Sequence, residues 1–575
     1  MCQAPKIFLA SDVDATVKRV AAGSHAWAAL GVEGRLRHLH TLRSKLSHAD
    51  FAAWTAGSIH AQGLDPNSDL GRAQQVAEMM TMSAVAAGEL GRIADTCKRL
   101  AAGRAPALKL RRSATSEQVV CSTFPVTRYD KWCNPLALAG FSSEVWLAPG
   151  AEATQGGEAL KTSSTADGGR VCVVLGAGNQ DFLTLVDCID KLFVRGCAVI
   201  VKHHPVRQHQ HEHFLRCFEP LIELGVFASV VGDAEVGAKL VHHESVASVH
   251  LTGGVATHDA IVWGGAPSAA APQPMLTKPI TSELGCVTPF IITPDAAWTT
   301  KQLTHHAWQL ANACAAQAHC NCLSPQALLI AGDWEHADAF VATLKDALRQ
   351  IPIAVPYYPG VQKRHAKFAE HYGDRAERIG ESLSPGAAAD AAERFGEALP
   401  LLLIDLAEAE LEAGELAISE EAFAPVLAVV RLAAKPTAED FLPAATAFAN
   451  ERCWGNLSCT LVLHPASEAA APAAVDAALE SLRYGIVAIN AWSSLAYAME
   501  TASWGGYHVD NKLDDVRSGV GVVRNCLMLD HALKSVVRTP FLSKLHLTQK
   551  IDDFSIGPRM VRAMAWMSKV IARYA

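Results

Sequence analysis

Two cysteines stand two positions apart in the stretch AHCNCLSPQALLI, residues 318–330, just before an apolar run typical of a strand. Thiols at this spacing allow three kinds of chemistry: metal binding, a redox pair or a single nucleophile. A metal site would combine Cys314, His319, Cys320 and Cys322, but none of the common zinc spacings occurs there. Both thiols of the pair also fit burial as small hydrophobic side chains. The stretch alone does not decide among these possibilities.

Glu283 and Glu421 are the carboxylates whose surroundings favour a chemical role. Glu283 lies in TSELGCVTP, residues 281–289, where no helical face is available to hold it as an ordinary solvated charge. Glu421 in EEAFAPV, residues 420–426, either starts a strand or serves a site, and its neighbour Glu420 is the one we expect in solvent. Because a positioned carboxylate can act as a general base, Glu283 is our candidate for that role.

The stretch GAGNQD follows an apolar strand and invites comparison with the dinucleotide-binding fingerprint G-x-G-x-x-G. The third glycine of that fingerprint would fall at Asp181, so the fingerprint fails. A dinucleotide bound to this part of the chain would therefore not be held by the standard glycine turn.

Histidines crowd the stretch HHPVRQHQHEH, residues 203–213, and the whole chain has 24 of them. We expect most of these side chains to be exposed. Metal binding by the cluster is the alternative, because neutral imidazole is a common metal ligand.

The scaffold that must position these residues is clearest from residue 171 onward. Short apolar strands alternate with helical stretches through VCVVLGAGN, CAVIVKHHP, VFASVVGD and SVASVHLTGG. This alternation predicts a doubly wound α/β sheet with parallel strands, and such sheets bind ligands at the carboxyl ends of their strands. The residues expected at those ends are Asn179, Lys202, Gly253 and Gly254.

The remainder of the chain is organised around this sheet. Residues 1 to about 130 show the apolar periodicity of helices. Residues 150–168 are polar and rich in glycine, which indicates a hairpin tip or a linker. A second α/β block has strand-like stretches from PFIITPDA to GIVAIN, and KSVVRTPF near the end predicts a further strand.

Composition and charge exclude several classes of protein. The chain has 575 residues, half of them hydrophobic, which indicates two to four globular domains. Its net charge of −8 gives no general attraction to nucleic acid or anionic lipid. We expect no membrane span and no secretory signal, because long apolar runs and a basic leader are missing. Fifteen cysteines, an odd number in a large chain, predict free thiols in a reducing cytoplasm.

The chain resembles the aldehyde dehydrogenase superfamily. The resemblance rests on the strand-end residues and on four stretches that follow them in order: TSELGCVTP, HCNCLSPQ, EEAFAPV and LRYGIVAIN. The resemblance runs from about residue 140 to residue 540. Asn179 precedes the strand-end Lys202 as the family's asparagine precedes its lysine, and LTGG matches a threonine-glycine-serine turn. ELGC matches a glutamate-leucine-glycine-glycine box, and EAFAP matches a glutamate-x-phenylalanine-glycine-proline box.

The resemblance implies NAD(P)-dependent oxidation of an aldehyde to a carboxylic acid through a cysteine thiohemiacetal and a thioester. Thiolate suits this chemistry because it is a strong nucleophile near neutral pH and forms a thioester that water can cleave. Asn179 and the backbone N–H of the nucleophile would donate to the oxyanion, and Glu283 would activate the water. The residues implied to hold the cofactor are Lys202, Gly253, Gly254, Glu421 and Phe423.

Cys322 fits the family's nucleophile better than Cys320 does. In the family a small residue follows the nucleophile at its second position, and a strand begins a few positions later. Counting from Cys322 gives Ser324 and then ALLI from Ala327, whereas counting from Cys320 puts a Ser-Pro pair where the strand should start. The arginine often found near this place is replaced by Gln326, which leaves one contact in doubt but not the nucleophile.

The cofactor is expected to be NAD or NADP, with measurable use of both. Three residues after Lys202, where NAD-preferring relatives often carry a glutamate, this chain has Pro205. An acidic side chain there would bind the ribose 2′-hydroxyl and repel a 2′-phosphate, so its absence removes the discrimination against NADP. His203, His204 and Arg207 could favour a phosphate, with simple solvation of the histidines as the alternative.

The resemblance also implies a domain layout and an assembly. We expect a helical N-terminal region with the NAD(P)-binding domain over 1–149 and 169–280, and a catalytic domain over 281–505. An oligomerisation hairpin with the C-terminal arm would take up 150–168 and 506–575, and KSVVRTPF would meet the hairpin. Because a lone protruding hairpin is marginal in water unless its edge pairs, a homodimer or homotetramer is expected.

Two alternatives use the same fold. A CoA-acylating aldehyde dehydrogenase or acyl-CoA reductase would use the cysteine but pass the acyl group to a thiol, so it would have no use for Glu283. A non-catalytic scaffold would not need Asn179, Glu283, Cys322 and Glu421 together. The sequence does not identify the aldehyde, because the loops that line its channel cannot be placed.

Overall fold

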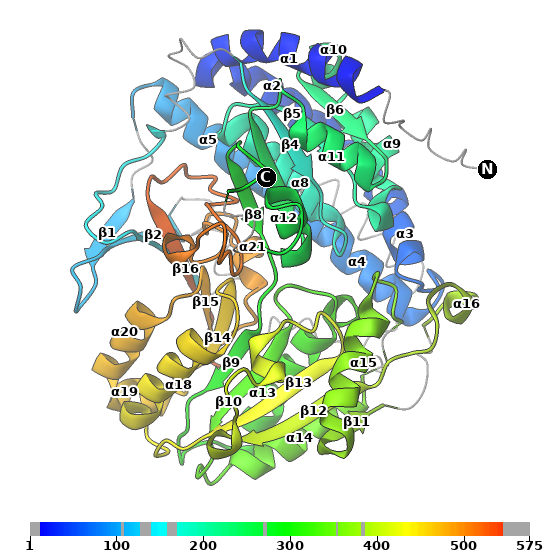
Figure 1. The fold of residues 1–575 in the computed structure, drawn as a ribbon. Helices are drawn as coiled ribbons and strands as arrows, with labels where there is room; N and C mark the ends of the chain where they lie inside the picture. The colour runs from blue at the N-terminus through cyan, green and yellow to red at the C-terminus, as the bar shows by residue number, and fades with distance from the viewer. Residues whose placement is uncertain are drawn as a thin grey trace.

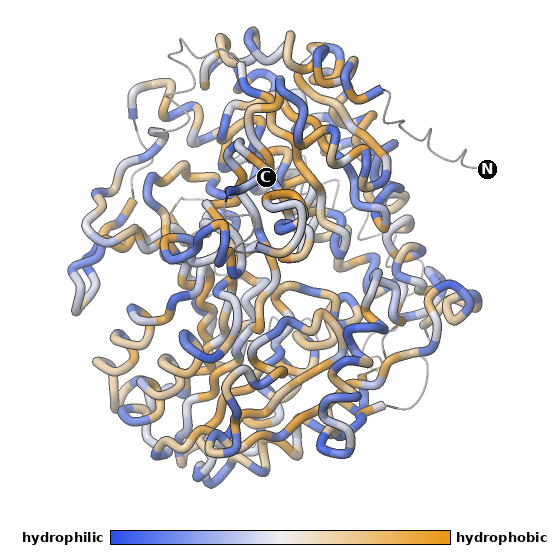
Figure 2. The backbone as a smooth tube through the Cα atoms, in the orientation of Figure 1, coloured by the Kyte–Doolittle hydropathy of each residue, from blue (hydrophilic) through white to orange (hydrophobic). Residues whose placement is uncertain are grey.

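The computed structural model describes residues 12–104, 108–126, 140–157, 169–267 and 273–543, apart from positions 352, 354 and 381–385. In this part of the chain two β-sheets are each flanked by helices, the smaller in the upper half of Figure 1 and the larger extending through the lower half. Hydrophobic stretches follow the inner strands, whereas hydrophilic stretches lie mostly on outer helices and loops (Figure 2).

The smaller sheet is the parallel, doubly wound sheet that the sequence predicts from residue 171 onward. Its five strands are parallel and lie in the order β6-β5-β4-β7-β8. Almost every residue of β4 and β5 is buried, as expected for parallel strands covered on both faces. The strands are β4 (Val171–Leu175), β5 (Ala198–Lys202), β6 (Phe227–Val230), β7 (Ser248–Thr252) and β8 (Ile280–Glu283).

Helices connect these strands and cover the sheet. The chain runs outward from β4 to β6 and then returns to place β7 on the other side of β4. That reversal is the switch point at which such sheets bind ligands. The connecting helices are α8 (Asp181–Ile189), its π-helical end η3 (Asp190–Val194), the short 3₁₀ turn η4 (Pro205–Arg207), α9 (Gln210–Cys217), α10 (Glu219–Glu223), α11 (Ala234–His242) and α12 (Val255–Val262).

The larger sheet has eleven strands in the order β1-β2-β3-β16-β15-β14-β9-β10-β13-β12-β11. The run from β16 to β12 is parallel, and β11 and β1 to β3 are antiparallel to their neighbours. Its strands after β8 are β9 (Thr288–Ile292), β10 (Pro325–Ala331), β11 (Ala376–Ile379), β12 (Leu401–Ala407), β13 (Val426–Leu432), β14 (Ser458–Val462), β15 (Ile486–Ile489) and β16 (Ala532–Arg538). The helices beside it include α13 (Thr300–Ala315), α14 (Ala337–Arg349), α15 (Val361–Tyr372), α18 (Ala438–Arg452) and α20 (Pro472–Ser481).

The N-terminal residues are helical, as the sequence predicts, and they pack on the smaller sheet. Trp27 and Leu39 belong to the same hydrophobic core as Val173 of β4, and the Trp27 ring meets the edge of Phe193. A shared core agrees with grouping these helices with the first sheet, while the domain boundaries stay a prediction. The helices are α1 (Val13–Ala29), α2 (Gly31–Ser47), α3 (Phe51–Ala61), α4 (Asp69–Ala84), the π-helical turn η2 (Val85–Glu89) and α5 (Leu90–Ala101).

The structure has a hairpin that the sequence analysis did not predict. Strands β1 (Lys109–Arg112) and β2 (Val119–Phe124) form an antiparallel hairpin at the left of Figure 1, and β3 (Ser142–Leu147) joins them to β16. Residues 150–157 contain only an isolated bridge, from Gln155 to Leu529, and 158–168 lie outside the described residues. Glycine and polar composition marked the turn after β3 but could not identify the strands before it.

Among the described residues, no helix is both long and apolar enough to cross a membrane. Helices of this chain that are long, such as α1 and α2, carry charged residues along their outer faces.

Candidate active site

The two sheets meet end to end at a short connection. Glu283 ends β8 of the smaller sheet, and Thr288 begins β9 of the larger one. The carboxyl ends of the first sheet's strands therefore face the amino ends of parallel strands β9, β10 and β13. This arrangement brings Cys322, which lies just before β10, against Glu283, with 3.4 Å between Sγ and Oε1.

The turn that carries Cys322 is held on several sides. Before it, Gln317, Ala318 and His319 have positive φ angles of 50°, 55° and 65°, a conformation that is uncommon outside glycine and is often found at functional turns. The carbonyl of Cys322 accepts a hydrogen bond from the Thr288 hydroxyl at 3.3 Å. The next carbonyl, of Leu323, accepts one from the Trp492 indole at 2.8 Å. The thiol is thus presented by a backbone with little freedom to move.

The two cysteines of the opening motif have different surroundings. Cys320 is fully buried, its Sγ lies 3.8 Å from the Phe423 carbonyl, and burial raises the pKa of its thiol to about 12. Cys322 is the single cysteine among the described ones that is not fully buried. No group of three or more metal-ligating side chains occurs in the described residues, and the cysteines there are free thiols.

Glu283 is buried, with partners on both carboxylate oxygens. Its Oε2 accepts hydrogen bonds from the Trp504 indole at 2.7 Å and from the Tyr497 hydroxyl at 3.3 Å. Burial raises the pKa of Glu283 to about 7, with the charge of Asp187 as a further cause. Burial and the Glu283 carboxylate raise the pKa of Cys322 well above its ordinary value. The resting pair is therefore a neutral thiol beside a carboxyl group that titrates near neutrality.

Asn179 lies in the loop between β4 and α8 and is nearly buried. Its backbone carbonyl accepts hydrogen bonds from the Arg207 guanidinium and, at 3.5 Å, from the Tyr357 hydroxyl. Arg207 also donates to the Gly178 carbonyl at 2.9 Å and to Asp181 at 2.9 Å. The hydrogen bonds found among the described residues join Cys322 to Glu283 but do not include the Asn179 amide. The fixed loop keeps Asn179 just beyond the carboxyl end of β4.

Replacing Arg207 with leucine should lower the free energy of unfolding by about 3–5 kcal/mol, because Asp181 would remain as a buried charge with only His209, at 3.0 Å, as an ion-pair partner. Arg207 and Asp181 are both almost fully buried. Urea denaturation of the intact chain measures the change. Arg99→Leu is the matched control, since Arg99 and Asp95 form a pair of 2.8 Å with about half of each side chain exposed, which contributes about 1 kcal/mol or less. Equal effects of the two substitutions would contradict the structural role of Arg207.

The histidines near Arg207 are not solvated, so the expectation of exposure is wrong for this stretch. His203 is fully buried, bonds the Ser229 hydroxyl at 2.8 Å, and has a pKa lowered to about 3 by burial. His204 stacks on Tyr358, and burial lowers its pKa to about 4. Arg207 is occupied by Asp181 and by backbone carbonyls. His203 and Arg207 are therefore not available to bind a 2′-phosphate, whereas His204 is partly exposed and uncharged near neutral pH.

Lys202, Gly253 and Gly254 stand at the carboxyl ends of β5 and β7, as predicted. Burial lowers the pKa of Lys202, and the charge of Asp233, the N-cap of α11, acts in the opposite direction. An added Cβ at Gly254 would meet nothing within 4 Å, so the backbone in front of α12 is open to a ligand. An ammonium group beside a helix N-terminus suits the phosphates of a dinucleotide.

Glu421 and Phe423 lie in the segment before β13 of the larger sheet, and Phe423 packs against Tyr358. Glu421 Oε1 accepts the backbone N–H of Cys286 at 3.1 Å, and burial raises the pKa of Glu421 to about 7. An added Cβ at Gly285 would lie 1.8 Å from Glu421 Oε2, so the glycine leaves room for this carboxylate. A carboxylate acceptor suits ribose hydroxyls. Together with Lys202 and Gly254, these residues fit the dinucleotide that the sequence resemblance implies.

Gln326, which replaces the expected arginine, holds the segment of Glu421. Its side-chain amide donates to the Glu420 carbonyl at 2.7 Å, and its Oε1 accepts the Ala422 N–H at 2.8 Å. The Gln326 side chain thus bonds the backbone of the residue before Glu421 and of the residue after it. In this chain an uncharged side chain therefore holds the segment around Glu421.

Sequence reasoning missed Trp504 and Tyr497 as site residues, and it assigned Arg207 to a phosphate rather than to Asp181. Trp504 and Tyr497 lie in an irregular segment between β15 and β16, where no periodicity fixes the direction of a side chain. Asp181 was visible only as the residue that breaks the glycine fingerprint. Its pairing with Arg207 joins positions that no local pattern relates.

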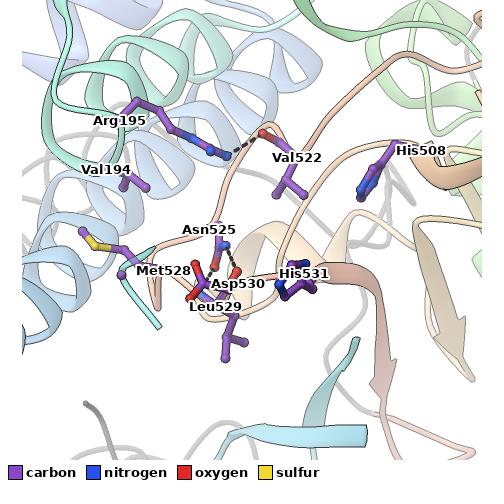
Figure 3. A pocket seen from close by; sticks show the side chains of 11 residues that line it. Val194, Arg195, His508, Val522, Asn525, Met528, Leu529, Asp530 and His531 are labelled. Carbon is purple, nitrogen blue, oxygen red and sulfur yellow. Dashed lines mark hydrogen bonds between the residues drawn. The ribbon is translucent and has the colours of Figure 1, made fainter. Parts of the chain in front are cut away.

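A separate cavity of about 280 Å³ opens beside the end of η3 and the segment before β16 (Figure 3). Its lining includes Arg195, His508, Asn525 and His531. Arg195 donates to the Val522 carbonyl at 2.9 Å, as drawn in Figure 3. None of the predicted catalytic residues lines this cavity, so it is not the catalytic centre described above.

Comparison with known proteins gives one family match. The model of the aldehyde dehydrogenase family matches residues 170–510, which is more than half of the chain. A search of curated proteins found no match.

Solved structures with the same fold cover nearly the whole chain at low identity. Lactaldehyde dehydrogenase from Escherichia coli is 16% identical, with 93% of this chain and 92% of that chain covered at a TM-score of 0.60. NADP-dependent glyceraldehyde-3-phosphate dehydrogenase from Bacillus halodurans, in complex with NADP, is 16% identical over 93% and 92% at 0.54. Indole-3-acetaldehyde dehydrogenase from P. syringae, in complex with NAD+, is 16% identical over 93% and 89% at 0.56.

Proposed function

Because the chain belongs to the aldehyde dehydrogenase family, we propose that it oxidises an aldehyde to a carboxylic acid with NAD or NADP, using Cys322 as the nucleophile. The observation that carries this proposal is the 3.4 Å contact between the Cys322 thiol and the Glu283 carboxylate where the two sheets meet. Relatives of the same fold were solved with NADP and with NAD+, which supports either dinucleotide as the cofactor.

The first half of the reaction forms a bond between Cys322 and the aldehyde carbon. The thiol proton can pass to Glu283 or to solvent, since Cys322 is partly exposed. The sulfur then adds to the carbonyl carbon, and the oxyanion that develops accepts hydrogen bonds from the Asn179 amide and the Cys322 backbone N–H. When bound, the oxidised dinucleotide supplies the hydride acceptor that turns the Cys322 adduct into a thioester.

The second half releases the acid. Glu283 takes a proton from a water molecule, the water oxygen adds to the thioester carbon, and the carbon–sulfur bond breaks. The product leaves as a carboxylic acid, and the Cys322 sulfur regains a proton. Lys202, Gly253, Gly254, Glu421 and Phe423 are the residues that we assign to the dinucleotide.

Activity with a panel of short, long and aromatic aldehydes, each with NAD and with NADP, tests the proposed function. Acid formation that matches reduced cofactor one to one is the expected result. An enzyme that passes the acyl group to CoA would turn over only when CoA is present, and the buried, ionisable Glu283 beside the thiol speaks against that alternative. A scaffold would bind the dinucleotide in a titration but would neither oxidise aldehydes nor cleave 4-nitrophenyl acetate.

Both cofactors should support turnover, with a preference of less than about a hundredfold in kcat/KM, or roughly 2.7 kcal/mol. Pro205 follows Lys202 where an acidic side chain would exclude a 2′-phosphate. His203 and Arg207 cannot attract one because they are buried and engaged, and His204, whose pKa burial lowers to about 4, carries no charge near neutral pH. Neither cofactor is therefore selected strongly at this position. Initial rates with each cofactor measure the ratio, and a preference beyond a thousandfold would mean that another residue reads the 2′ position.

The chain should form a homodimer or a homotetramer through the β1–β2 hairpin. Strand β1 is exposed at every residue and forms one edge of the larger sheet, and about half of the Leu110 side chain is exposed. An open edge with an exposed leucine is stabilised by pairing with another strand. Light scattering at micromolar concentration measures the mass, and a monomer would contradict the expectation. The free thiols of the described residues fit a reducing compartment such as the cytoplasm.

A further inference from the structure

The second oxygen of the Glu283 carboxylate has two donors that the proposed mechanism does not use. Oε1 faces the Cys322 thiol, whereas Oε2 accepts hydrogen bonds from the Trp504 indole at 2.7 Å and the Tyr497 hydroxyl at 3.3 Å. Tyr497 lies in the short helix α21 (Leu495–Ala498), and Trp504 follows in the loop toward β16. The carboxylate is thus held between the thiol on one side and two aromatic donors on the other.

The two donors are themselves fixed by packing. Their rings lie against each other with 3.9 Å between centroids, and Phe182 of α8 meets the Tyr497 ring at 5.0 Å. The Arg524 guanidinium lies 5.1 Å from the centre of the Tyr497 ring and donates to the Tyr497 carbonyl at 3.1 Å. The Trp504 backbone N–H donates to the Arg524 carbonyl at 2.9 Å.

Arg524 links this arrangement to the N-terminal helices. Its Nε lies 3.2 Å from Glu89 at the end of the π-helical turn η2, and both side chains are almost fully buried. A charged pair inside the protein holds the segment between β15 and β16 against the helices beneath it. Neither Trp504 nor Tyr497 is therefore free to turn away from Glu283 without disturbing a buried contact.

The surroundings of Glu283 would otherwise disfavour its charge. Asp187 of α8 adds negative charge, the Cys322 thiol lies in front, and Arg524 stands behind the Tyr497 ring rather than beside the carboxylate. Burial and Asp187 raise the pKa of Glu283, whereas the hydrogen bonds from Trp504, Cys322 and Tyr497 lower it. Of the groups that favour the charged form, the two aromatic donors remain in place when Cys322 carries an acyl group.

We propose that Trp504 and Tyr497 are positioning residues for the general base: they keep the Glu283 carboxylate turned toward Cys322 and in the charged form that accepts the proton of the hydrolytic water. This inference rests on the proposed function. It assigns Trp504 the larger share, because its hydrogen bond is the shorter one. The step itself remains a proton transfer from water to Glu283, and no proton moves to or from the aromatic side chains.

Trp504→Phe and Tyr497→Phe remove the donors and keep an aromatic ring at each position. In a plot of turnover against pH, the acidic limb is the range in which turnover declines as Glu283 becomes protonated. Because hydrogen bonds to charged groups are strong, losing the Trp504 donor should move the midpoint of this limb upward by about 1 pH unit. Turnover at pH 7 should fall about fivefold for Trp504→Phe, approaching tenfold at pH values well below 7, and less for Tyr497→Phe. Both variants should approach the wild-type rate at alkaline pH. The burst of reduced cofactor should keep its amplitude, since acylation of Cys322 does not need the water-activating base.

Trp334→Phe is the matched control, because it removes a buried indole that donates to the Asp295 carbonyl at 3.0 Å, away from the site. Its acidic limb should coincide with that of the wild type. Turnover that falls equally at every pH in Trp504→Phe, or a limb that does not move in either variant, would overturn the inference.

Hydrolysis of 4-nitrophenyl acetate, which needs no cofactor, separates this inference from the proposed function. If the wild type oxidised no aldehyde but cleaved the ester with an acidic limb that Trp504→Phe shifts, the positioning role would stand and the proposed function would fail. If aldehyde turnover showed a limb and neither variant moved it in either assay, the positioning role alone would fail. A wild type that neither oxidises aldehydes nor hydrolyses 4-nitrophenyl acetate would overturn both the positioning role and the proposed function.

Discussion

Replacing Cys322 with alanine should abolish aldehyde turnover, with a loss on the order of 10⁴-fold or more, because the reaction then has no atom that can hold the acyl group. The Cys322 Sγ is the sulfur that touches Glu283, at 3.4 Å, and its turn is fixed by Thr288 and Trp492. Steady-state rates of cofactor reduction measure the loss. Cofactor affinity, measured by fluorescence titration, should stay close to the wild-type value, since the thiol is not among the residues assigned to the dinucleotide.

Cys320→Ala is the control for that result, since it also removes one thiol, from a cysteine that lies two positions before Cys322. Cys320 is fully buried against the Phe423 carbonyl, and burial raises its pKa to about 12. A substantial fraction of the activity should therefore survive the substitution. If Cys320→Ala were inactive and Cys322→Ala active, the assignment of the nucleophile would be wrong by two residues.

Replacing Glu283 with glutamine should lower turnover by about 10²–10⁴-fold while leaving a burst of reduced cofactor. The substitution keeps the shape of the side chain and removes the base, so the thioester forms but is hydrolysed slowly. Stopped-flow absorbance separates the burst from the steady state. An absent burst, with no acyl group on the enzyme, would remove Glu283 from the deacylation step.

The wild-type rate of deacylation should rise with pH, as expected when a general base must be deprotonated to act. Burial raises the pKa of Glu283 to about 7, and the carboxylate accepts a proton only in its charged form. Deacylation is therefore expected to be fastest above pH 7 and to decline as the pH falls through that value. Glu283→Gln should lose this dependence, which makes it the reference for the wild-type profile.

Much of the fold could be predicted from the sequence because its signals are local. The apolar runs of β4, β5 and β7 are buried on both faces, and this is why their composition alone indicates parallel strands. The residues at the ends of those strands, Asn179, Lys202 and Gly253, follow from the same pattern, since parallel strands end at a common edge. The hairpin β1–β2 was not predicted, because a short, exposed edge strand such as β1 has neither alternation nor a buried run.

The site could be predicted only where a motif carried it. Cys322 and Glu283 stand in short stretches with recognisable neighbours, whereas Trp504 and Tyr497 reach Glu283 from a segment more than 200 positions away. The histidines after β5 were misjudged for a related reason. Their polar composition suggested solvent, but His203 is buried with Ser229 as its partner and His204 against Tyr358. The burial of these side chains depends on contacts with residues that are distant in the sequence, and local sequence patterns do not predict such contacts.

Intact-protein mass spectrometry of Glu283→Gln, mixed with an aldehyde and the oxidised cofactor and quenched in acid, tests the central claim most directly. The account predicts one added acyl group per chain, with the mass of the aldehyde less two hydrogens, on the peptide that contains Cys322. The adduct should disappear in the Glu283→Gln protein that also carries Cys322→Ala and persist when it carries Cys320→Ala. An acyl group on another residue, or a burst of reduced cofactor without any acyl-enzyme, would contradict the assignment of Cys322 as the nucleophile.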